Sequence, residues 1–569
     1  MNSIYLAIIG LGIFYLGYKF YSSYISKHIY ALDEDLKTPA HEFQDDIDYV
    51  PTKKHILFGH HYTSIAGAAP IIGPCIAAYW GWLPALTWVV LGTVFMGAVH
   101  DFGALVMSLK EKGRSVADIT GNLINSRARL MFLIFVLLLT WLVLAVFAMA
   151  ISGLFTAVPT AVLPVNIEII IAMIIGYLIY KKKIDALVPS LIALAILYIF
   201  VYIGTFTPLT LPFADSNKAW IIMLFMYSSI ASLLPVWFLL QPRDFINSHQ
   251  LIVGLGLLFL GIFIAVPIVD APVIRLSTEA GAPPIFPMLF VTIACGAISG
   301  FHGLVSSGTT SKQVNKLKDA RFIGYGGMIG EGILALASTL AAVAGIALVS
   351  QCNLPSVGHV ENLNWAVYYD SWSHAAANKA TAFVLGGGAL IEQLGLPHNL
   401  AKTLMAVLVI SFAATTLDTA TRIQRFIISE IGGATKIHFL TNKYIATAIA
   451  VIPAITLALW SVPDPVTGEL KKAGWILWPI FGASNQMLAA LILMVLTIYF
   501  YKKGKNILPL LLPMIFVMSI ALISLTMKAQ QFLNQGNNLL FGLNCILLGL
   551  IVWMISEGLL MFRKLKQNS

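Results

Sequence analysis

The chain has 569 residues, of which 58% are apolar and 11% are charged, and its formal net charge is +9. Soluble domains carry about 25% charged residues, so this composition excludes an ordinary soluble protein and is typical of a membrane protein. The positive charge indicates basic cytoplasmic loops and no nucleic-acid partner. The four cysteines form no Cys-x-x-Cys pair, which argues against a disulfide framework or a zinc ribbon.

Apolar runs long enough to cross a bilayer, about 20 residues each, occur fifteen times along the chain. We therefore expect an all-α polytopic membrane protein of about fifteen transmembrane helices. Placing the N-terminus outside puts most Lys and Arg residues, and the C-terminus, in the cytoplasm, as the positive-inside rule requires. The fifteen runs are 3–22, 56–82, 84–109, 130–154, 165–181, 185–206, 219–241, 250–270, 286–309, 323–350, 399–421, 444–461, 475–500, 507–527 and 539–562.

These runs predict one membrane domain without an independent soluble part. Between the tenth and eleventh runs, residues 351–398 form a long outer region, either a re-entrant hairpin or an external cap. The predicted divisions are a first helix with a cytoplasmic interfacial segment (1–55), a transporter core (56–500) that contains inverted repeats at about 56–206 and 286–500 joined by two helices (219–270), and C-terminal helices (501–569).

The second and ninth runs contain residues that weaken a helix near its centre. The second reads "FGHHYTSIAGAAPIIGP" from Phe58, where Pro70 removes a backbone donor, and the ninth includes "ACGAISGFHG" from Ala294. Two interrupted helices in oppositely oriented halves indicate an inverted-repeat transporter with its site near mid-membrane. The glycines could instead only permit close helix packing. The predicted substrate-binding residues are Gly67, Ala68, Ala69, Pro70, Gly296, Ala297, Ser299, Asn485 and Gln486.

Ionisable side chains from several runs fall into one layer in the cytoplasmic half of the predicted membrane. Such groups are costly in a membrane and commonly functional, and histidine titrates near neutral pH. We predict proton coupling or gating by His60, His61, His100, Asp101, His302 and Glu331. Alternatives are a structural hydrogen bond between His100 and Asp101, and a Zn²⁺ site of His60, His61 and His302, although no His-x-x-x-His spacing supports the metal.

Adjacent hydroxyl groups in the eleventh run, "TTLDTATR", suit a hard cation such as Na⁺. We predict a cation site of Ala66, Thr415, Thr416 and Asp418, with a structural ion pair between Asp418 and Arg422 as the alternative for that pair. No nucleotide-binding or hydrolase motif occurs, so we expect that the protein is not an enzyme and binds no cofactor. We expect an H⁺ or Na⁺ gradient to supply the energy for its function. No obvious Arg or Lys lies within the predicted membrane interior, which favours peptides over pyruvate as substrate.

Six sequence blocks resemble the carbon starvation protein A family over about residues 50–500. The resemblance implies a bacterial inner-membrane protein linked to uptake of peptides, and in some members of pyruvate, under nutrient limitation. It also implies a LeuT-like inverted repeat in which runs two and nine are the broken helices and run eleven supplies the threonines. The blocks are "FGHHYTSIAGAAPIIGP", "GAVHDF", "FPMLFVTIACGAISGFHGLVSSGTT", "DARFIGYGGM", "TTLDTATR" and "FGASNQMLAA".

Together these features predict a secondary active transporter that imports short peptides through the bacterial inner membrane, with H⁺ or Na⁺ as coupling ion. One alternative is a symporter for pyruvate or another small monocarboxylate. A nutrient sensor or a channel is a further alternative, although the cytoplasmic stretches are short for a sensor. Expected partners are a small-molecule substrate and the lipid bilayer; the sequence predicts no oligomeric state.

Overall fold

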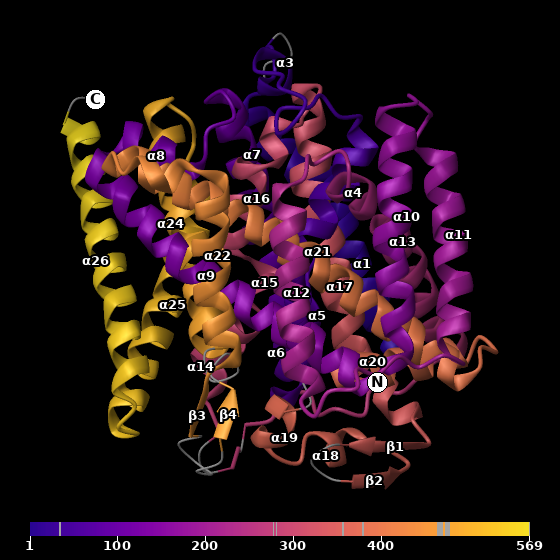
Figure 1. The fold of residues 1–569 in the computed structure, drawn as a ribbon. Helices are drawn as coiled ribbons and strands as arrows, with labels where there is room; N and C mark the ends of the chain where they lie inside the picture. Colours follow the sequence, from indigo (N-terminus) through magenta and orange to yellow (C-terminus); the bar gives the residue numbers. More distant parts are fainter. Residues whose placement is uncertain are drawn as a thin grey trace.

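The computed structural model describes residues 1–32, 36–276, 278–279, 282–354, 358–377, 380–463, 470–472 and 478–567. The long helices form one bundle, with two small β-hairpins at one end (Figure 1). The N-terminus lies at this same end, and the C-terminus lies at the other (Figure 1). The start of the predicted run 475–500, and parts of the outer region 351–398, lie outside the described residues.

The helices of the first half are α1 (Ser3–Leu16), α2 (Ser22–Tyr24), α3 (Pro39–Glu42), α4 (Lys54–Ile65), α5 (Ala69–Ala77), α6 (Trp82–Gly92), α7 (Ala98–Lys110), α8 (Val116–Leu123), α9 (Ser126–Ala157), α10 (Val162–Tyr180), α11 (Leu187–Gly204), α12 (Ser216–Leu233) and α13 (Leu240–Ala265). Those of the second half are α14 (Ile285–Thr292), α15 (Ala294–Ala297), α16 (Gly300–Gly308), α17 (Gly326–Val343), α18 (Trp365–Tyr368), α19 (Trp372–Ala377), α20 (Thr381–Glu392), α21 (His398–Thr435), α22 (Lys443–Leu459), α24 (Trp478–Lys502), α25 (Leu508–Asn534) and α26 (Asn538–Gln567). The two antiparallel hairpins pair β1 (Gln351–Leu354) with β2 (Gly358–Glu361) and β3 (Ser461–Pro463) with β4 (Leu470–Lys472).

Eleven helices among the described residues are long and apolar enough to cross a membrane, and the bent pair formed by α4 and α5 gives a twelfth. The three remaining predicted runs correspond to α12, the interrupted α14–α16 and the 17-residue α22. The structure therefore has a multi-pass helical fold, and the number fifteen stays a prediction.

Burial separates a protein-facing interior from a rim suited to lipid. The described part of α24 from Ile480 to Lys502 is buried throughout its most apolar window, whereas only 22% of that of α26 is buried. Large apolar side chains are exposed on the outward faces of α10, α11 and α26, as expected where hydrocarbon replaces water as the solvent. Examples are Ile170, Ile174, Ile192, Ile199, Ile546 and Trp553.

The outer region forms a cap over the end of α5. The Trp365 indole donates a hydrogen bond to the Ala78 carbonyl (3.0 Å), and the Tyr369 hydroxyl donates to the Cys75 carbonyl (2.6 Å). Next to this cap, α20 is a short, largely buried apolar helix packed against α17 and α21. The described part of 351–398 therefore combines an external cap with one buried helix.

Candidate functional site

The first interruption separates α4 from α5 and bends the chain by 45°. Residues Ala66–Ala68 are not helical, and Ala66 has φ −76° and ψ 59°. Pro70 lies in the first turn of α5, where its missing N–H and fixed φ are tolerated. Of the predicted substrate-binding residues, only Gly67 and Ala68 therefore lie in the break, because Ala69 and Pro70 already belong to the restarted helix.

The second interruption divides the ninth predicted run into α14, α15 and α16. The backbone is extended at Ile298 (φ −160°, ψ 132°) and Ser299 (φ −137°, ψ 129°), and Ile293 also leaves the helical pattern. Gly296 and Ala297, which we expected in the unwound part, instead form the short turn α15. Ser299 is extended because it is the N-cap residue of α16, a position that takes β-region dihedral angles.

The two interrupted spans pack directly on each other. A Cβ atom added at Gly73 would lie 2.5 Å from the Thr292 carbonyl oxygen, and one at Gly296 would lie 3.6 Å from the Pro70 Cα atom. Only glycine permits the first approach, because real Cβ atoms do not come within 3.0 Å of such a neighbour. Glycine therefore permits close packing of the two spans, and both spans are also interrupted.

The polar pair of α24 is tied to the second break. The Asn485 side-chain oxygen accepts from the Phe301 N–H (3.0 Å), and its amide group donates to the Ser299 hydroxyl (2.9 Å). Asn485 thereby satisfies a donor at the start of α16 that Ser299 leaves uncapped. Gln486 donates to the Phe290 carbonyl (2.7 Å) and leaves its own oxygen without a partner. Asn485 and Gln486 therefore both contact the interrupted span α14–α16, and Asn485 stabilises the start of α16.

Four of the predicted coupling residues form one buried group, which we call the histidine cluster: His100, Asp101, His302 and Glu331. Asp101 on α7 contacts His100 Nδ1 (2.7 Å) and His302 Nδ1 (2.9 Å). His302 Nε2 lies 3.2 Å from Glu331 Oε2 on α17, yet neither oxygen of Glu331 has a hydrogen-bond partner. All four side chains are at most 1% exposed. The His100–Asp101 hydrogen bond exists, but it is one part of a larger network.

The adjacent histidines of α4 point to different neighbours. His61 Nδ1 lies 3.0 Å from the Thr310 hydroxyl, and a Cβ atom added at Gly327 on α17 would lie 2.8 Å from His61 Cδ2. His61 therefore borders the histidine cluster, because Gly327 is one turn from Glu331. His60 Nδ1 lies 2.5 Å from Asp244 Oδ2 on α13 and thereby contacts a second group of charges.

That second group, which we call the Arg243 cluster, comprises Glu168, Tyr227, Arg243, Asp244, Asn247 and Asp418. Arg243 Nη1 lies 2.6 Å from Asp418 Oδ2 and donates to the Tyr227 hydroxyl, which donates to Asp418 in turn (2.8 Å). Glu168 on α10 accepts from the Ser411 hydroxyl (2.7 Å). Arg243 is buried in α13, a candidate membrane span, which corrects our expectation that the membrane interior holds no obvious arginine.

Sequence reasoning missed Arg243 and Glu168, although each left a signal. Glu168 is an isolated acid inside the apolar run "VLPVNIEIIIAM", and such residues are functional candidates by default. Arg243 falls between the predicted runs 219–241 and 250–270, whereas α13 begins earlier than the second of these runs, at Leu240. Proline is tolerated in the first turn of a helix, so Pro242 does not mark its boundary.

The structure gives the predicted cation ligands different partners. Thr415 accepts a hydrogen bond from the Asn247 amide (3.1 Å), whereas Thr416 donates to the Ser64 carbonyl (3.3 Å) and faces Gly67 beside the buried Ala66. Asp418 pairs with Arg243, so a guanidinium already occupies one oxygen of this carboxylate. The alternative ion pair within α21 is not formed, because Arg422 contacts Asp48 (3.0 Å) instead.

Among the described residues, no three His, Cys, Asp or Glu side chains are arranged to hold a metal ion. His60 and His61 turn to different neighbours, which explains why they and His302 do not converge. This geometry gives no support to the zinc alternative.

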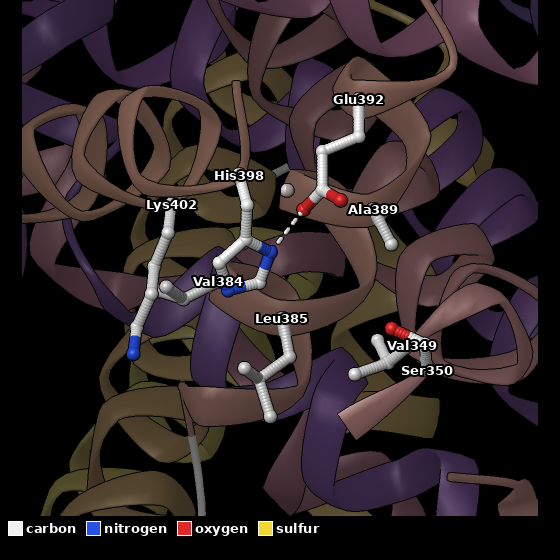
Figure 2. A pocket seen from close by; sticks show the side chains of 9 residues that line it. Val349, Ser350, Val384, Leu385, Ala389, Glu392, His398 and Lys402 are labelled. Atoms are coloured by element: carbon white, nitrogen blue, oxygen red, sulfur yellow. Dashed lines mark hydrogen bonds and ion pairs between the residues drawn. The ribbon is translucent and has the colours of Figure 1, made fainter. Parts of the chain in front are cut away.

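Two small cavities lie away from the breaks. The inner one, of about 30 Å³, is bordered by Ser307, Glu430 and Lys312, whose ammonium lies 4.6 Å from the Phe426 ring centroid. Burial lowers the pKa of Lys312, opposed by the charges of Asp48 and Glu430. The outer one, of about 10 Å³, is shown in Figure 2. There His398 Nδ1 lies 2.7 Å from Glu392 Oε1, with Lys402 alongside.

These features define a multi-pass helical membrane protein with two interrupted helices around a buried polar interior. Residues 2–524 match the family described as carbon starvation protein CstA. The chain belongs to this family.

Curated relatives resemble the chain over most of its length. It is 32% identical to the peptide transporter CstA of Helicobacter pylori (strain ATCC 700392 / 26695), covering 93% of this chain and 82% of the relative. It is 31% identical to the peptide transporter CstA of Escherichia coli (strain K12), covering 89% and 78%. It is also 31% identical to the pyruvate/proton symporter BtsT of the same strain, with the same coverage. The relatives thus support a membrane transporter.

Among solved structures, a manganese transporter from Eremococcus coleocola is similar with a TM-score of 0.48 and 14% identity, over 91% of this chain and 99% of that one.

Proposed function

We propose that the protein is a secondary active transporter that imports short peptides across the bacterial inner membrane and serves nutrient scavenging under carbon starvation. One observation carries the proposal: the two broken helices meet at Pro70 and Gly296, and the second continues directly into the histidine cluster through His302. Interrupted backbone can bind a substrate, and an ionisable cluster next to it can couple binding to an ion.

We propose H⁺ as the coupling ion. The histidine cluster holds two carboxylates and two imidazoles, and its ion pairs involve no Lys or Arg among the described residues. A proton is therefore the natural charge to balance it. Na⁺ is the alternative, supported by Thr416 and the Ser64 carbonyl at the first break. The proposed transport site also includes His61 and the predicted substrate-binding residues at the two breaks, Gly67–Pro70 and Gly296, Ala297 and Ser299.

The proposed architecture has fifteen spans, with an N-terminus outside and a cytoplasmic C-terminus. It includes a LeuT-like inverted repeat formed by residues 56–206 and 286–500. Two observations support this arrangement: the termini lie at opposite ends of the bundle (Figure 1), as an odd number of spans requires, and each proposed repeat contains one broken helix.

A second candidate function is symport of pyruvate or another small monocarboxylate. The buried Arg243 favours it, because two of its nitrogens, Nε and Nη2, lack hydrogen-bond partners and suit a carboxylate. A relative named a pyruvate/proton symporter points the same way. Because α13 contains the buried Arg243, the expectation that the membrane interior holds no arginine no longer argues against pyruvate.

The test is uptake of labelled dipeptide and labelled pyruvate into proteoliposomes under imposed pH or Na⁺ gradients. We expect dipeptide to accumulate with an inward H⁺ gradient and not with Na⁺ alone. His61→Ala and Thr416→Ala should be measured alongside. Accumulation that ignores both gradients would refute coupled transport, and normal transport by both variants would refute the site assignment.

A further inference from the structure

The Arg243 cluster contains six buried polar atoms without a hydrogen-bond partner: Glu168 Oε1, Arg243 Nε, Arg243 Nη2, Asp244 Oδ1, Asn247 Oδ1 and Asp418 Oδ1. The residues that carry them are at most 2% exposed. Buried polar groups in proteins are hydrogen-bonded in roughly 90% of cases or more. Glu168 and Asn247 are close enough to hydrogen-bond each other, so four exceptions remain, on Arg243, Asp244 and Asp418, and a polar ligand can complete them.

The unpartnered donors form one edge of a guanidinium. Arg243 uses Nη1 for Asp418 and the Tyr227 hydroxyl, which leaves the Nε and Nη2 side free. Asp244 Oδ1 lies 3.9 Å from Nη2, beyond hydrogen-bond distance. Two parallel N–H groups on one edge of arginine match the two oxygens of a carboxylate. The free edge is therefore suited to the carboxylate of a ligand.

The unpartnered acceptors come from the helices around this arginine. Asn247 is one turn beyond Arg243 on α13 and donates to Thr415, and Glu168 accepts from Ser411. Ser411, Thr415 and Asp418 share one face of α21, since they are spaced four and three residues apart. Helices α10, α12 and α13 all pack against α21, so the acceptors collect on one side of it. A ligand here also needs groups that donate hydrogen bonds.

The acidic side chains of the cluster outnumber its single guanidinium. The ionisable groups acting on Arg243 are Asp418, Tyr227, Asp244 and Glu168, and His60 contacts Asp244. Three carboxyl groups thus surround one guanidinium, and each that is ionised without a cation of its own is costly away from water. A ligand with only a carboxylate would add to the excess negative charge. A ligand with a carboxylate and an ammonium group would satisfy the free donors and the free acceptors together.

We propose that the Arg243 cluster binds a small zwitterion, an amino acid or a short peptide, whose carboxylate pairs with the free edge of Arg243 and whose ammonium group lies among Glu168, Asp244 and Asp418. This inference rests on the proposed transport function and selects between its two candidate substrates. The cluster is closed in this structure, so the ligand reaches it only after the surrounding helices open.

The test is binding to purified full-length protein in lipid nanodiscs, measured by calorimetry. The probes are dialanine, N-acetyl-dialanine, which lacks the ammonium group, and pyruvate. Dialanine should bind at least about tenfold more tightly than either of the others, because each loses charge-assisted hydrogen bonds. N-acetyl-dialanine or pyruvate binding as tightly as dialanine, or no binding of dialanine, would overturn the proposal.

Variants locate the site. Arg243→Lys keeps the positive charge but removes the two parallel N–H donors of the guanidinium. It should weaken dialanine binding at least about tenfold. Glu168→Gln should weaken dialanine more than N-acetyl-dialanine. Arg321→Gln is the matched control, because Arg321 bonds to Ser22 and the Tyr18 carbonyl, and it should bind as the wild type does.

The outcomes separate this site from the transport function. Unchanged dialanine affinity in a folded Arg243→Lys protein would refute the site even where gradient-driven uptake occurs. Dialanine that binds at Arg243 without accumulating under any gradient would refute coupled transport and leave the site intact. Arg243→Gln, checked by size-exclusion chromatography, provides a second variant with the same expected loss.

Discussion

The two buried clusters differ in how their negative charges are balanced. In the Arg243 cluster a permanent cation lies 2.6 Å from Asp418. In the histidine cluster the partners of Asp101 and Glu331 are imidazoles, whose charge depends on bound protons. Both lie in the interior and both contact an interrupted span or its neighbour. The difference indicates a division of labour, with a fixed charge in one cluster suited to holding a ligand and titratable charges in the other suited to carrying protons.

The largest expected effect is loss of stability when Arg243 is replaced. In Arg243→Gln, Asp418 becomes a buried carboxylate without its cation, which costs about 3–5 kcal/mol. Thermal unfolding in detergent measures the change. The double variant Arg243→Gln with Asp418→Asn should recover part of the loss, because it removes both charges. Equal destabilisation of the single and double variants would show that the pair does not balance the cluster.

The next largest effect concerns proton coupling through Glu331. A pH difference of two units supplies about 2.7 kcal/mol per proton, enough for roughly hundredfold accumulation. Glu331→Gln cannot take up or release a proton, so we expect accumulation driven by pH to disappear while exchange of substrate across the membrane continues. Uptake and counterflow in proteoliposomes measure the two separately.

Glu392→Gln is the matched control for that experiment. Glu392 also contacts a histidine, His398, but this pair lies in the outer cavity and is partly exposed (Figure 2). Its replacement should leave accumulation unchanged. If Glu392→Gln abolished accumulation and Glu331→Gln did not, the histidine cluster would lose its assigned role.

The sequence predicts much of the fold and part of the site. Long apolar runs and helix-weakening residues are local properties, so the two interrupted helices can be predicted, although the non-helical residues lie just before Pro70 and just after Ala297. The histidine cluster is also predictable as a layer, because depth along a helix follows from residue count. Its members then meet in the structure, as His302 and Asp101 show.

Pairing between helices is what the sequence does not reveal. Asp418 and Arg422 have ideal spacing for an ion pair within one helix, yet each takes a partner from elsewhere in the chain, Arg243 and Asp48. Such choices depend on which helices are neighbours and how each is rotated. For the same reason the threonines of α21 diverge, since adjacent helical residues point in directions about 100° apart.

A smaller effect is expected in the C-terminal half of α21, outside both clusters. Asp48→Asn removes the charge opposite Arg422 but retains an oxygen acceptor, and hydrogen bonds involving a charged group contribute about 1.5–3 kcal/mol. We expect a loss of stability toward the lower end of this range, measured by thermal unfolding. Because a partly exposed pair is screened by salt, the difference should shrink as ionic strength rises. If Asp48→Asn lost as much stability as Arg243→Gln, the Arg243–Asp418 ion pair would contribute no more to stability than the partly exposed Asp48–Arg422 pair.

The smallest effect is expected from Thr416→Val, which removes one hydroxyl and preserves shape. The lost hydrogen bond to the Ser64 carbonyl contributes about 0.5–1.5 kcal/mol to stability, and the break keeps its packing against Gly67. If protons alone drive transport, the variant should retain pH-driven accumulation at nearly the wild-type level. If Na⁺ binds at this break, the variant should need a higher Na⁺ concentration for half-maximal uptake, because a cation ligand is gone. A Na⁺ titration of uptake in both proteins therefore decides whether a second ion acts beside the histidine cluster.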